Sequence, residues 1–309
     1  MLKSVAQSVG NPLKTSAVQV ESWRFPWLWH AFSNRHGGIS TAYTRAEGSP
    51  EIPPEFGPPS PVAGDLNLGW TKDDDPAHVQ ENRRRFTALV TASAQGSEQH
   101  NLPPMITVRQ IHSAHTLVVK NLAEESAFVG PDGRAFQEAD GLVTNVPGVL
   151  LGIQTADCVP VFLVDPIHHA VGVFHAGWRG TVARIVERGV ATMAREFGSQ
   201  PSDLLAAIGP SIGACCYTVG DEVFQQFTQN FSYASMLFRR AQLEPGAHTV
   251  DLWEANRRQL LDAGLLADSI SVIGECTGCT GLPGPRKYFS HRMEKGFTGR
   301  MMSAIGIVP

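Results

Sequence analysis

The sequence predicts a layered α/β or α+β fold, formed by a single large domain. Its 309 residues, of which 42% are hydrophobic, are enough to bury a substantial core. Short apolar runs rich in β-branched residues occupy the middle of the chain, and segments with apolar residues at helical spacing follow them. This alternation of two kinds of segment is typical of proteins in which helices and sheets form separate layers.

Five short apolar runs predict the strands. They cover residues 105–111, 149–155, 159–164, 170–174 and 270–273. The four runs in the middle of the chain are apolar at nearly every position rather than at alternate positions, which indicates strands buried on both faces. We therefore expect the core of the domain to form around them.

Two helices are predicted from apolar periodicity. After Gly180, apolar residues recur at helical spacing as far as Phe197, and Gly198 is a natural stop. A second helix is predicted over residues 252–263. The stretch of residues 230–248 carries aromatic residues with no clear period, and the sequence alone assigns it no structure.

The ends of the predicted domain follow from composition. Residues 1–25 are expected to be an N-terminal extension and residues 26–309 the domain, with a proline-rich surface loop at residues 47–65. The first twenty residues mix polar and apolar side chains, so they do not resemble a secretory signal. No later stretch is apolar for long enough to cross a bilayer. These features predict a cytoplasmic protein that does not associate with a membrane.

Charge and cysteine content exclude further classes. The formal net charge is −4 and the isoelectric point is near 6.3, which argues against nucleic acid as a partner. Five cysteines are an odd number in a long chain, and reduced thiols are the better assumption. The spacing of Cys276 and Cys279 is by itself weak evidence for a metal or redox site, so a structural role is favoured. Cys215 and Cys216 are expected to fill a turn.

Three separated residues of metal-ligand type lie at the edges of the predicted strands. They are His112, Cys158 and His175. Two imidazoles and one thiolate make an open zinc site, because structural zinc usually takes four protein ligands and catalytic zinc keeps a position for water or substrate. Each residue has an alternative role as a hydrogen-bonded or small apolar side chain in the core. The separations in the sequence are long, so the zinc hypothesis requires that the fold bring the three together.

The residues around these ligands resemble the YfiH/YlmD-like family, which has been labelled both laccase-like polyphenol oxidase and purine nucleoside phosphorylase. The resemblance runs from about residue 32 to the C terminus, in the family's order. Its most specific motifs are Thr-Ala-Asp-Cys at residues 155–158 and His-Ala-Gly-Trp-Arg-Gly at residues 175–180. The others lie at residues 32–40, 66–69, 82–84, 110–112, 139–141, 209–212, 216–217, 289–292 and 299–300.

The resemblance implies a fold, a metal and an activity. The fold is the layered architecture shared with the deamidase domain of cytotoxic necrotizing factors. The metal is zinc, bound by His112, Cys158 and His175. The activity is phosphate-dependent cleavage of the N-glycosidic bond of adenosine, inosine, guanosine and 5'-methylthioadenosine, accompanied by adenosine deaminase activity. The implied partners are therefore a small purine nucleoside and phosphate.

Catalytic residues are predicted beside the ligands. Deamination needs a general acid or base, and Asp157 and Asp140 are the nearest candidates in the sequence. Either carboxylate could instead orient a metal-bound histidine. Arg179 lies between Gly177 and Gly180 at the start of a predicted helix, where it could hold phosphate together with the helix N-terminal amides. Gly177 and Gly180 are themselves candidates for contact with substrate or phosphate.

Other motifs of the family supply three more candidates for contact with substrate or phosphate. These are Arg35, Asn67 and Arg292. For an arginine, the alternative is a salt bridge with no part in binding.

Rival functions remain open. Cys158 could be the nucleophile of a cysteine hydrolase or amidase, with His175 as its base. An editing role toward cell-wall precursors has been attached to bacterial members of the family. A copper-dependent oxidase of phenols is less favoured, because only His168 and His169 are adjacent and no His-x-His pair occurs. Metal content discriminates between the zinc enzyme and the cysteine hydrolase, since a zinc-bound thiolate is not a free nucleophile.

Overall fold

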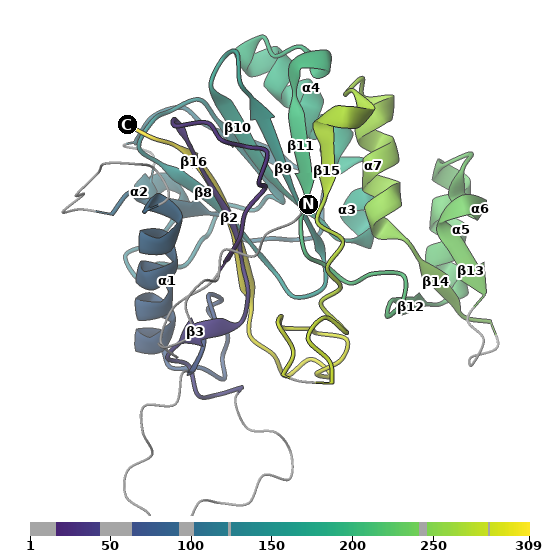
Figure 1. Ribbon diagram of the computed structural model, residues 1–309, viewed down its shortest axis with the longest axis horizontal. Helices are drawn as coiled ribbons and strands as arrows, with labels where there is room; N and C mark the ends of the chain where they lie inside the picture. Colours follow the sequence, from purple (N-terminus) through teal and green to yellow (C-terminus); the bar gives the residue numbers. More distant parts are fainter. Residues whose placement is uncertain (1–16, 44–63, 93–101, 123–124, 241–245, 284) are drawn as a thin grey trace, which may run out of the picture.

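Two β-sheets lie face to face, and helices cover their outer faces (Figure 1). This computed structural model describes the chain outside residues 1–16, 44–63, 93–101, 123–124, 241–245 and 284. Helix α1 (Pro76–Thr91) packs on the first sheet, while α4 (Ile185–Phe197) and α7 (Leu252–Asp262) pack on the second. The layered fold of helices and sheets predicted from the sequence is confirmed.

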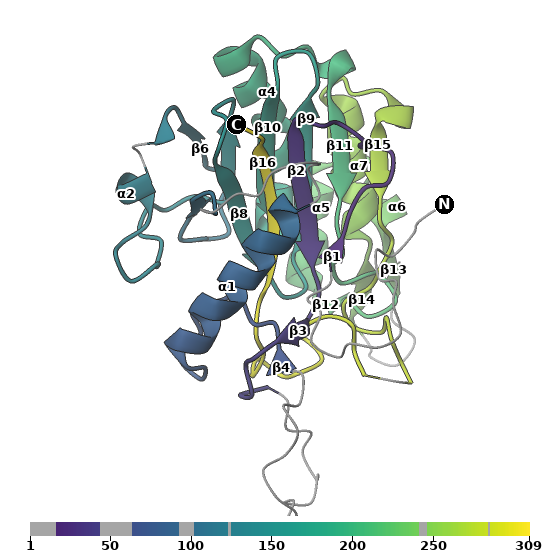
Figure 2. The ribbon, with the colours of Figure 1, turned by 60° about the vertical axis from the view of Figure 1, so that its left-hand side comes forward.

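The first sheet has five strands in the order β1-β2-β16-β8-β5. Its last strand in the sequence, β16, lies in the middle and pairs antiparallel with β2 and β8. Helix α1 crosses the outer face of this sheet and packs there through Phe86 and Val90 (Figure 2). The strands are β1 (Ala17–Val18), β2 (Leu28–Ser33), β16 (Met301–Ile307), β8 (Leu150–Thr155) and β5 (Met105–Thr107).

The second sheet has six strands in the order β15-β11-β9-β10-β7-β6. Its centre is the antiparallel hairpin of β9 and β10, in which Val159 faces Ala176 at the open end. The two outer pairs, β11 with β15 and β6 with β7, are parallel. The strands are β15 (Ile270–Val272), β11 (Leu205–Ile208), β9 (Val159–Asp165), β10 (Ala170–Ala176), β7 (Gly141–Thr144) and β6 (Thr116–Val119).

Strand β9 shows why the apolar runs predicted strands buried on both faces. Phe162 and Val164 point between the two sheets, and Val161 and Leu163 point toward α4 and α7. Phe162 stacks on Phe32 of the other sheet with ring centroids 4.3 Å apart. Because each face of the strand meets a different apolar layer, a polar residue fits at neither set of positions.

The helix predicted after Gly180 is in fact two helices, α3 (Trp178–Val182) and α4. Arg184 separates them, with a left-handed backbone of φ 63°. Gly198 ends α4 at φ 75°, the conformation in which glycine has no steric penalty. Helix α7 begins at Asp251, whose side chain accepts a hydrogen bond from the backbone N–H of Glu254.

A smaller group of elements projects beside the second sheet (Figure 1). It contains the described part of the aperiodic stretch of residues 230–248, which forms α6, β13 and the start of β14 in a small three-stranded sheet. Its elements are β12 (Thr218–Val219), α5 (Asp221–Asn230), α6 (Ala234–Leu237), β13 (Phe238–Arg240) and β14 (His248–Val250). The predicted strand at residues 105–111 is shorter than expected, because β5 ends at Thr107.

The structure describes only part of the predicted N-terminal extension and of the predicted proline-rich loop. Ala17 and Val18 form β1 and pair with β2, so these two residues of the predicted extension belong to the first sheet. Most of the predicted proline-rich loop lies outside the described residues. Its last two residues form β4 (Gly64–Asp65), which pairs with β3 (His36–Gly38). The remaining short elements are α2 (Glu125–Phe128) and two 3-10 turns at Pro201–Asp203 and Ala267–Ser269.

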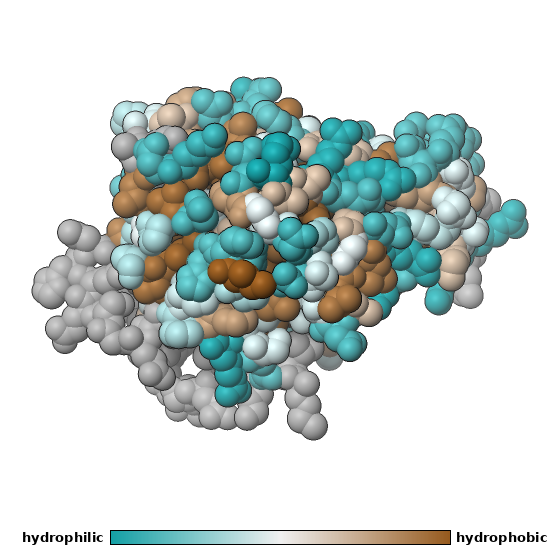
Figure 3. All heavy atoms as spheres, turned by 90° about the horizontal axis from the view of Figure 1, so that it is seen from above, coloured by the Kyte–Doolittle hydropathy of each residue, from teal (hydrophilic) through white to brown (hydrophobic). Residues whose placement is uncertain are grey.

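The surface shows no separation into polar and apolar halves in the view from above. Hydrophobic and hydrophilic side chains are interspersed there (Figure 3). Such scattered apolar side chains are ordinary on protein surfaces. Within the described part of the chain, no helix combines the length and the apolar character needed to span a membrane.

Candidate metal centre and its cavity

Three segments that are far apart in the sequence converge at one end of the sheets. The ligand atoms of His112, Cys158 and His175 all lie within 4.8 Å of one another. Cys158 immediately precedes β9, and His175 is the next-to-last residue of β10, so the hairpin itself brings them together. His112 comes from the loop after β5, and its ring meets that of His175 edge-on with centroids 4.9 Å apart. The fold therefore provides the convergence that the zinc hypothesis requires.

Two glycines allow this close approach. A Cβ atom on Gly177 would lie 3.0 Å from Cys158 Sγ and 3.3 Å from His112 Cδ2. A Cβ atom on Gly180 would lie 3.1 Å from the carbonyl oxygen of Ser113. A larger residue at either position would require these neighbours to shift by a few tenths of an ångström. The two glycines predicted to contact substrate thus shape the metal centre itself.

The carboxylate of Asp140 holds two of the three ligands. It is fully buried and accepts hydrogen bonds from the backbone N–H groups of Ile111, His112 and Ser113, at 3.2, 3.0 and 2.6 Å. It also accepts one from Nδ1 of His175 at 2.8 Å. Because that bond occupies Nδ1, the other ring nitrogen of His175 is left for a metal, which is the usual arrangement of a histidine ligand.

Charges in the metal-free site are strongly coupled. Burial alone raises the pKa of the Cys158 thiol, but His175 and His112 lower it to about 6. Burial alone lowers the pKa of His175, but the Cys158 thiolate and Asp140 raise it to about 9. Burial alone raises the pKa of Asp140, but hydrogen bonds from His175 and Ser113 lower it to about 2. The site therefore favours a thiolate, which is the form of cysteine that binds metals.

A cavity of about 770 Å³ opens in front of the three ligands. Its wall carries three aromatic side chains, those of Trp70, Trp178 and Tyr217. It is also rich in positive charge, because five arginines line it: Arg109, Arg134, Arg179, Arg292 and Arg300. A cavity with this lining is suited to an anionic ligand that carries a flat ring.

Arg179 and Arg292, two of the predicted binding residues, are on the cavity wall. The guanidinium of Arg179 lies over the ring of Trp178, 4.3 Å from its centroid. That of Arg292 lies over Tyr217 at 5.2 Å. Stacking of this kind fixes the plane of a guanidinium without using its N–H groups. Nη1 of Arg292 donates to the carbonyl of Thr218. Arg179 is exposed, and the helix that carries it, α3, has only five residues.

Asp157 faces its neighbouring loops. Oδ1 accepts hydrogen bonds from the hydroxyls of Thr277 and Ser290, at 2.6 and 2.7 Å, and Oδ2 accepts one from the backbone N–H of Arg292 at 2.7 Å. Its backbone is left-handed, with φ 89°. Three donors on one carboxylate are the contacts of a residue that orients its surroundings. Asp157, Cys158 and Arg292 all line the cavity.

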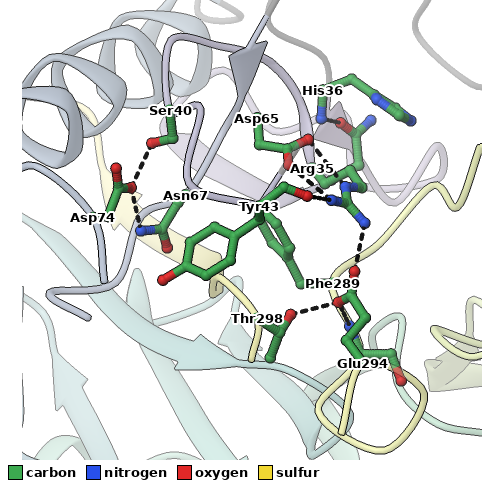
Figure 4. A network of polar contacts seen from close by, with 12 residues as sticks. Arg35, His36, Ser40, Tyr43, Asp65, Asn67, Asp74, Phe289, Glu294 and Thr298 are labelled. Atoms are coloured by element: carbon green, nitrogen blue, oxygen red, sulfur yellow. Dashed lines mark hydrogen bonds and ion pairs between the residues drawn. The ribbon is translucent and has the colours of Figure 1, made fainter. Parts of the chain in front are cut away.

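Arg35 is not brought to the cavity. It lies in a polar network (Figure 4), where its guanidinium contacts Asp65 Oδ2 at 2.7 Å and Glu294 Oε1 at 2.9 Å. The Phe289 ring lies 4.7 Å from the guanidinium carbon. Two carboxylates already neutralise this arginine, so its contacts are those of an internal ion-pair network.

Asn67 belongs to the same buried network and reaches the cavity indirectly. Its amide nitrogen donates to Asp74 Oδ2 at 2.7 Å (Figure 4), and its oxygen accepts from the backbone N–H of Arg300 at 2.8 Å. Asn67 therefore positions the strand start that carries Arg300. Its side chain is fully buried and does not itself line the cavity.

Trp70 and Arg134 are among the cavity residues that sequence reasoning missed. Both form part of the wall, and the Arg134 guanidinium lies 5.5 Å from the Trp70 ring centroid. Arg134 comes from the loop between α2 and β7, outside every motif that carries the family resemblance. No spacing or local pattern marks either residue, because the contact between them is made only in the folded chain.

Comparison with known proteins places this chain in a family. Residues 29–308 match the family described as "Multi-copper polyphenol oxidoreductase laccase". The chain belongs to this family. The same conclusion follows from a purine nucleoside phosphorylase, YlmD, of Geobacillus stearothermophilus, which is 38% identical over 246 residues, or 78% of this chain and 83% of the relative.

Two further comparisons refine the relationship. A crystal structure of the hypothetical protein YfiH of Bacillus licheniformis has a TM-score of 0.76 at 32% identity, covering 94% of this chain and 96% of that one. A relative named adenosine deaminase RL5, from an unknown prokaryotic organism, is 37% identical over 180 residues, 58% of this chain and 67% of the relative. The resemblance to the YfiH/YlmD-like family is confirmed, and so is the fold.

The family description names copper, and the available ligand groups can be compared with the needs of a multicopper centre. Among the described residues, only two groups could hold a metal ion: the trio of His112, Cys158 and His175, and a cluster of four cysteines. Neither contains the additional histidines that a multicopper centre needs. Two imidazoles and a thiolate that face a cavity instead fit a single ion with an open position.

The charge coupling predicts the titration of Cys158 in metal-free protein. Its thiol should ionise near pH 6, because His175 and His112 stabilise the thiolate, whereas the same thiol in unfolded chain should ionise at about 8.5. The rate of Cys158 alkylation by iodoacetamide, followed by peptide mass spectrometry, should rise through pH 6 and then level off. Protein unfolded in denaturant is the control. A folded-state midpoint at pH 8 or above contradicts this coupling.

Proposed function

We propose that this protein is a zinc-dependent purine nucleoside phosphorylase, acting on adenosine, inosine, guanosine and 5'-methylthioadenosine, with adenosine deaminase as a side activity. The observation that carries the proposal is the open donor set of two imidazoles and one thiolate at the base of an arginine-lined cavity. The names of the relatives from Geobacillus stearothermophilus and of adenosine deaminase RL5 support the same reading.

His112, Cys158 and His175 are suited to hold zinc. Their ligand atoms lie within 4.8 Å of one another, and two imidazoles with one thiolate are a donor set that zinc accepts. When bound, zinc supplies Lewis acidity to a ligand in the fourth position. Asp140 fixes the orientation of His175 and the loop of His112, and we assign it this positioning role.

Three arginines of the wall are suited to phosphate. The described ion pairs occupy Arg109, with Glu138 at 3.1 Å, and Arg134, with Asp132 at 3.6 Å. Among the described residues, no such ion pair involves the other three cavity arginines, which are Arg179, Arg292 and Arg300. A guanidinium group can donate two parallel hydrogen bonds to the oxygens of one phosphate. This part of the wall would therefore hold phosphate, the nucleophile of phosphorolysis.

The aromatic residues of the cavity wall are suited to bind the purine base. The faces of Trp178 and Tyr217 offer surfaces on which a purine can stack. In phosphorolysis the bond from C1' to the base nitrogen breaks, the base leaves with the electron pair, and a phosphate oxygen bonds to C1'. In deamination, water adds at C6 of adenosine and ammonia leaves. We assign Asp157 the positioning of Cys158 and Arg292 in both reactions.

A cysteine hydrolase is the second candidate, favoured by one specific arrangement. Cys158, His175 and Asp140 form a series of thiolate, imidazole and carboxylate, the geometry of an activated cysteine nucleophile. In that reaction the sulfur attacks an amide carbonyl and the amine leaves with a proton from His175. The reaction requires a thiolate free of metal, so metal dependence separates the two candidates.

Substitution of a metal ligand tests the proposed activity. Wild-type protein should release free base from the four nucleosides only when phosphate is present, and Cys158→Ser should lose about 100-fold or more of this activity, because second-shell changes alone cost 10–100-fold. Base release is measured by chromatography, and ammonia release from adenosine is assayed in parallel. Chelation should abolish the wild-type activity and zinc should restore it. Activity that survives chelation but is lost on alkylation of Cys158 would instead identify the cysteine hydrolase.

Truncation of Arg179 tests the phosphate site. Arg179→Ala should raise the KM for phosphate by about 10–100-fold, since a hydrogen bond to a charged group contributes about 1.5–3 kcal/mol, and should leave the KM for nucleoside nearly unchanged. Arg195→Ala is the matched control, because Arg195 is an exposed arginine on α4 that pairs with Glu196 outside the cavity. Equal KM values for phosphate in both variants would remove Arg179 from the phosphate site.

Neutralisation of Asp140 tests its positioning role. Asp140→Asn should weaken zinc binding by about 10–100-fold, because the amide cannot accept every hydrogen bond that the carboxylate accepts. Zinc affinity is measured by competition with a chelator. Asp165→Asn is the matched control: Asp165 is equally buried and bonds to His168 Nδ1 at 2.8 Å, at the far end of β9. Equal losses in the two variants would indicate a general effect on folding.

A further inference from the structure

Four of the five cysteines meet in a second cluster. Cys215 and Cys216 lie in the loop after β11, and Cys276 and Cys279 lie in the loop after β15. Their four Sγ atoms all lie within 4.8 Å of one another. The C-x-x-C spacing, which is weak evidence on its own, therefore has a second pair of cysteines opposite it.

The spacing of the sulfurs is that of metal ligands. Sγ of Cys215 lies 3.7 Å from Sγ of Cys279. In a disulfide the two atoms would be about 2.05 Å apart. Sulfurs placed tetrahedrally around zinc, at a Zn–S distance of about 2.3 Å, lie about 3.8 Å from one another. The pair thus has the separation of two corners of a zinc tetrahedron.

Backbone amides surround the buried sulfur of the cluster. Sγ of Cys276 accepts a hydrogen bond from the backbone N–H of Gly213 at 3.2 Å, and the backbone of Gly278 and of Cys279 also hydrogen-bonds to it. Donors two and three positions after the first cysteine of a C-x-x-C pair stabilise negative charge on sulfur. If all four sulfurs were thiolates, a group this close together would need a cation to offset its repulsion.

The two loops are built to meet at this point. Backbone hydrogen bonds join them, from Ser211 N–H to the carbonyl of Glu275 at 3.2 Å and from Thr277 N–H to the carbonyl of Ser211 at 3.1 Å. A Cβ atom on Gly278 would lie 2.9 Å from Cβ and 3.1 Å from Sγ of Cys216. Only glycine leaves room there for the cysteine pairs to approach.

We propose that Cys215, Cys216, Cys276 and Cys279 bind one structural zinc ion, separate from the ion proposed at His112. Four protein ligands leave no position for substrate, which is the pattern of structural rather than catalytic zinc. On binding, the thiols give up their protons to solvent and coordinate as thiolates. The ion would join two walls of the cavity: Tyr217 follows Cys216, and the hydroxyl of Thr277, next to Cys276, donates to Asp157 at 2.6 Å.

Metal content in three variants tests the proposal. The first, His112→Ala with Cys158→Ser, removes the other site and should retain one zinc per chain, with four sulfurs at about 2.3 Å by X-ray absorption. The second, Cys215→Ser with Cys279→Ser, should hold one zinc fewer than wild type. The third, Ala214→Ser, changes the same loop without removing a thiol and should keep the wild-type content. Zinc is counted by elemental analysis and native mass spectrometry under reducing conditions.

Two results would overturn the proposal, whatever the base-release assay shows. One is a zinc-supplied His112→Ala, Cys158→Ser protein that holds no zinc. The other is zinc in that protein with fewer than four sulfur neighbours. If Cys215→Ser with Cys279→Ser fails to fold, alkylation of the wild type decides the question. The four cysteines should then be protected when zinc is present and should react once a chelator removes it, whereas equal reactivity in both states would contradict a metal site.

Discussion

The buried carboxylate of Asp140 is the interaction on which the metal centre depends. It accepts hydrogen bonds from three successive backbone N–H groups of the His112 loop and from the ring of His175. Burial of a carboxylate is costly unless its lone pairs are occupied, and here these donors keep the pKa of Asp140 near 2. Without this carboxylate, the three backbone amides would lose their hydrogen-bond acceptor. His112 and His175 would no longer be held in a fixed position relative to each other.

The sheets give that interaction a rigid frame. Strands β9 and β10 are buried on both faces, so the hairpin end that carries Cys158 and His175 cannot shift without disturbing two apolar layers. Strand β16, at the centre of the other sheet, begins directly after Arg300. The rigid strands thus fix the positions of the ligands Cys158 and His175, while loops from many parts of the chain supply the cavity wall.

The sequence was most informative where one local pattern decided the structure. Continuous apolar runs predicted β8, β9 and β10, and Gly198 predicted the end of α4. The break at Arg184 was not predictable, because a left-handed arginine is held there by Glu187 and by the carbonyl of Asn230, a contact made only after folding. The positions of Trp70 and Arg134 at the cavity were not predictable for the same reason. Neither was the contact between the two cysteine pairs. Residue type at the strand edges and the family motifs both indicated the ligand trio. Long-range contacts decided that Arg35 faces Asp65 and Glu294 instead of the cavity.

The two sulfur sites are mechanically connected through one aspartate. Asp157 directly precedes Cys158, and its carboxylate is held by Thr277, which directly follows Cys276. The loop that carries Cys215 also contacts Asp157, whose carbonyl accepts a hydrogen bond from the backbone N–H of Ile212 at 2.9 Å. A displacement of either cysteine loop would therefore move the residue that precedes Cys158. Ser290 and the Arg292 amide share the same carboxylate, so the wall that bears Arg292 moves with it. A metal ion at the four cysteines would hence act on the cavity by holding Asp157 in its left-handed conformation, at a distance from any substrate.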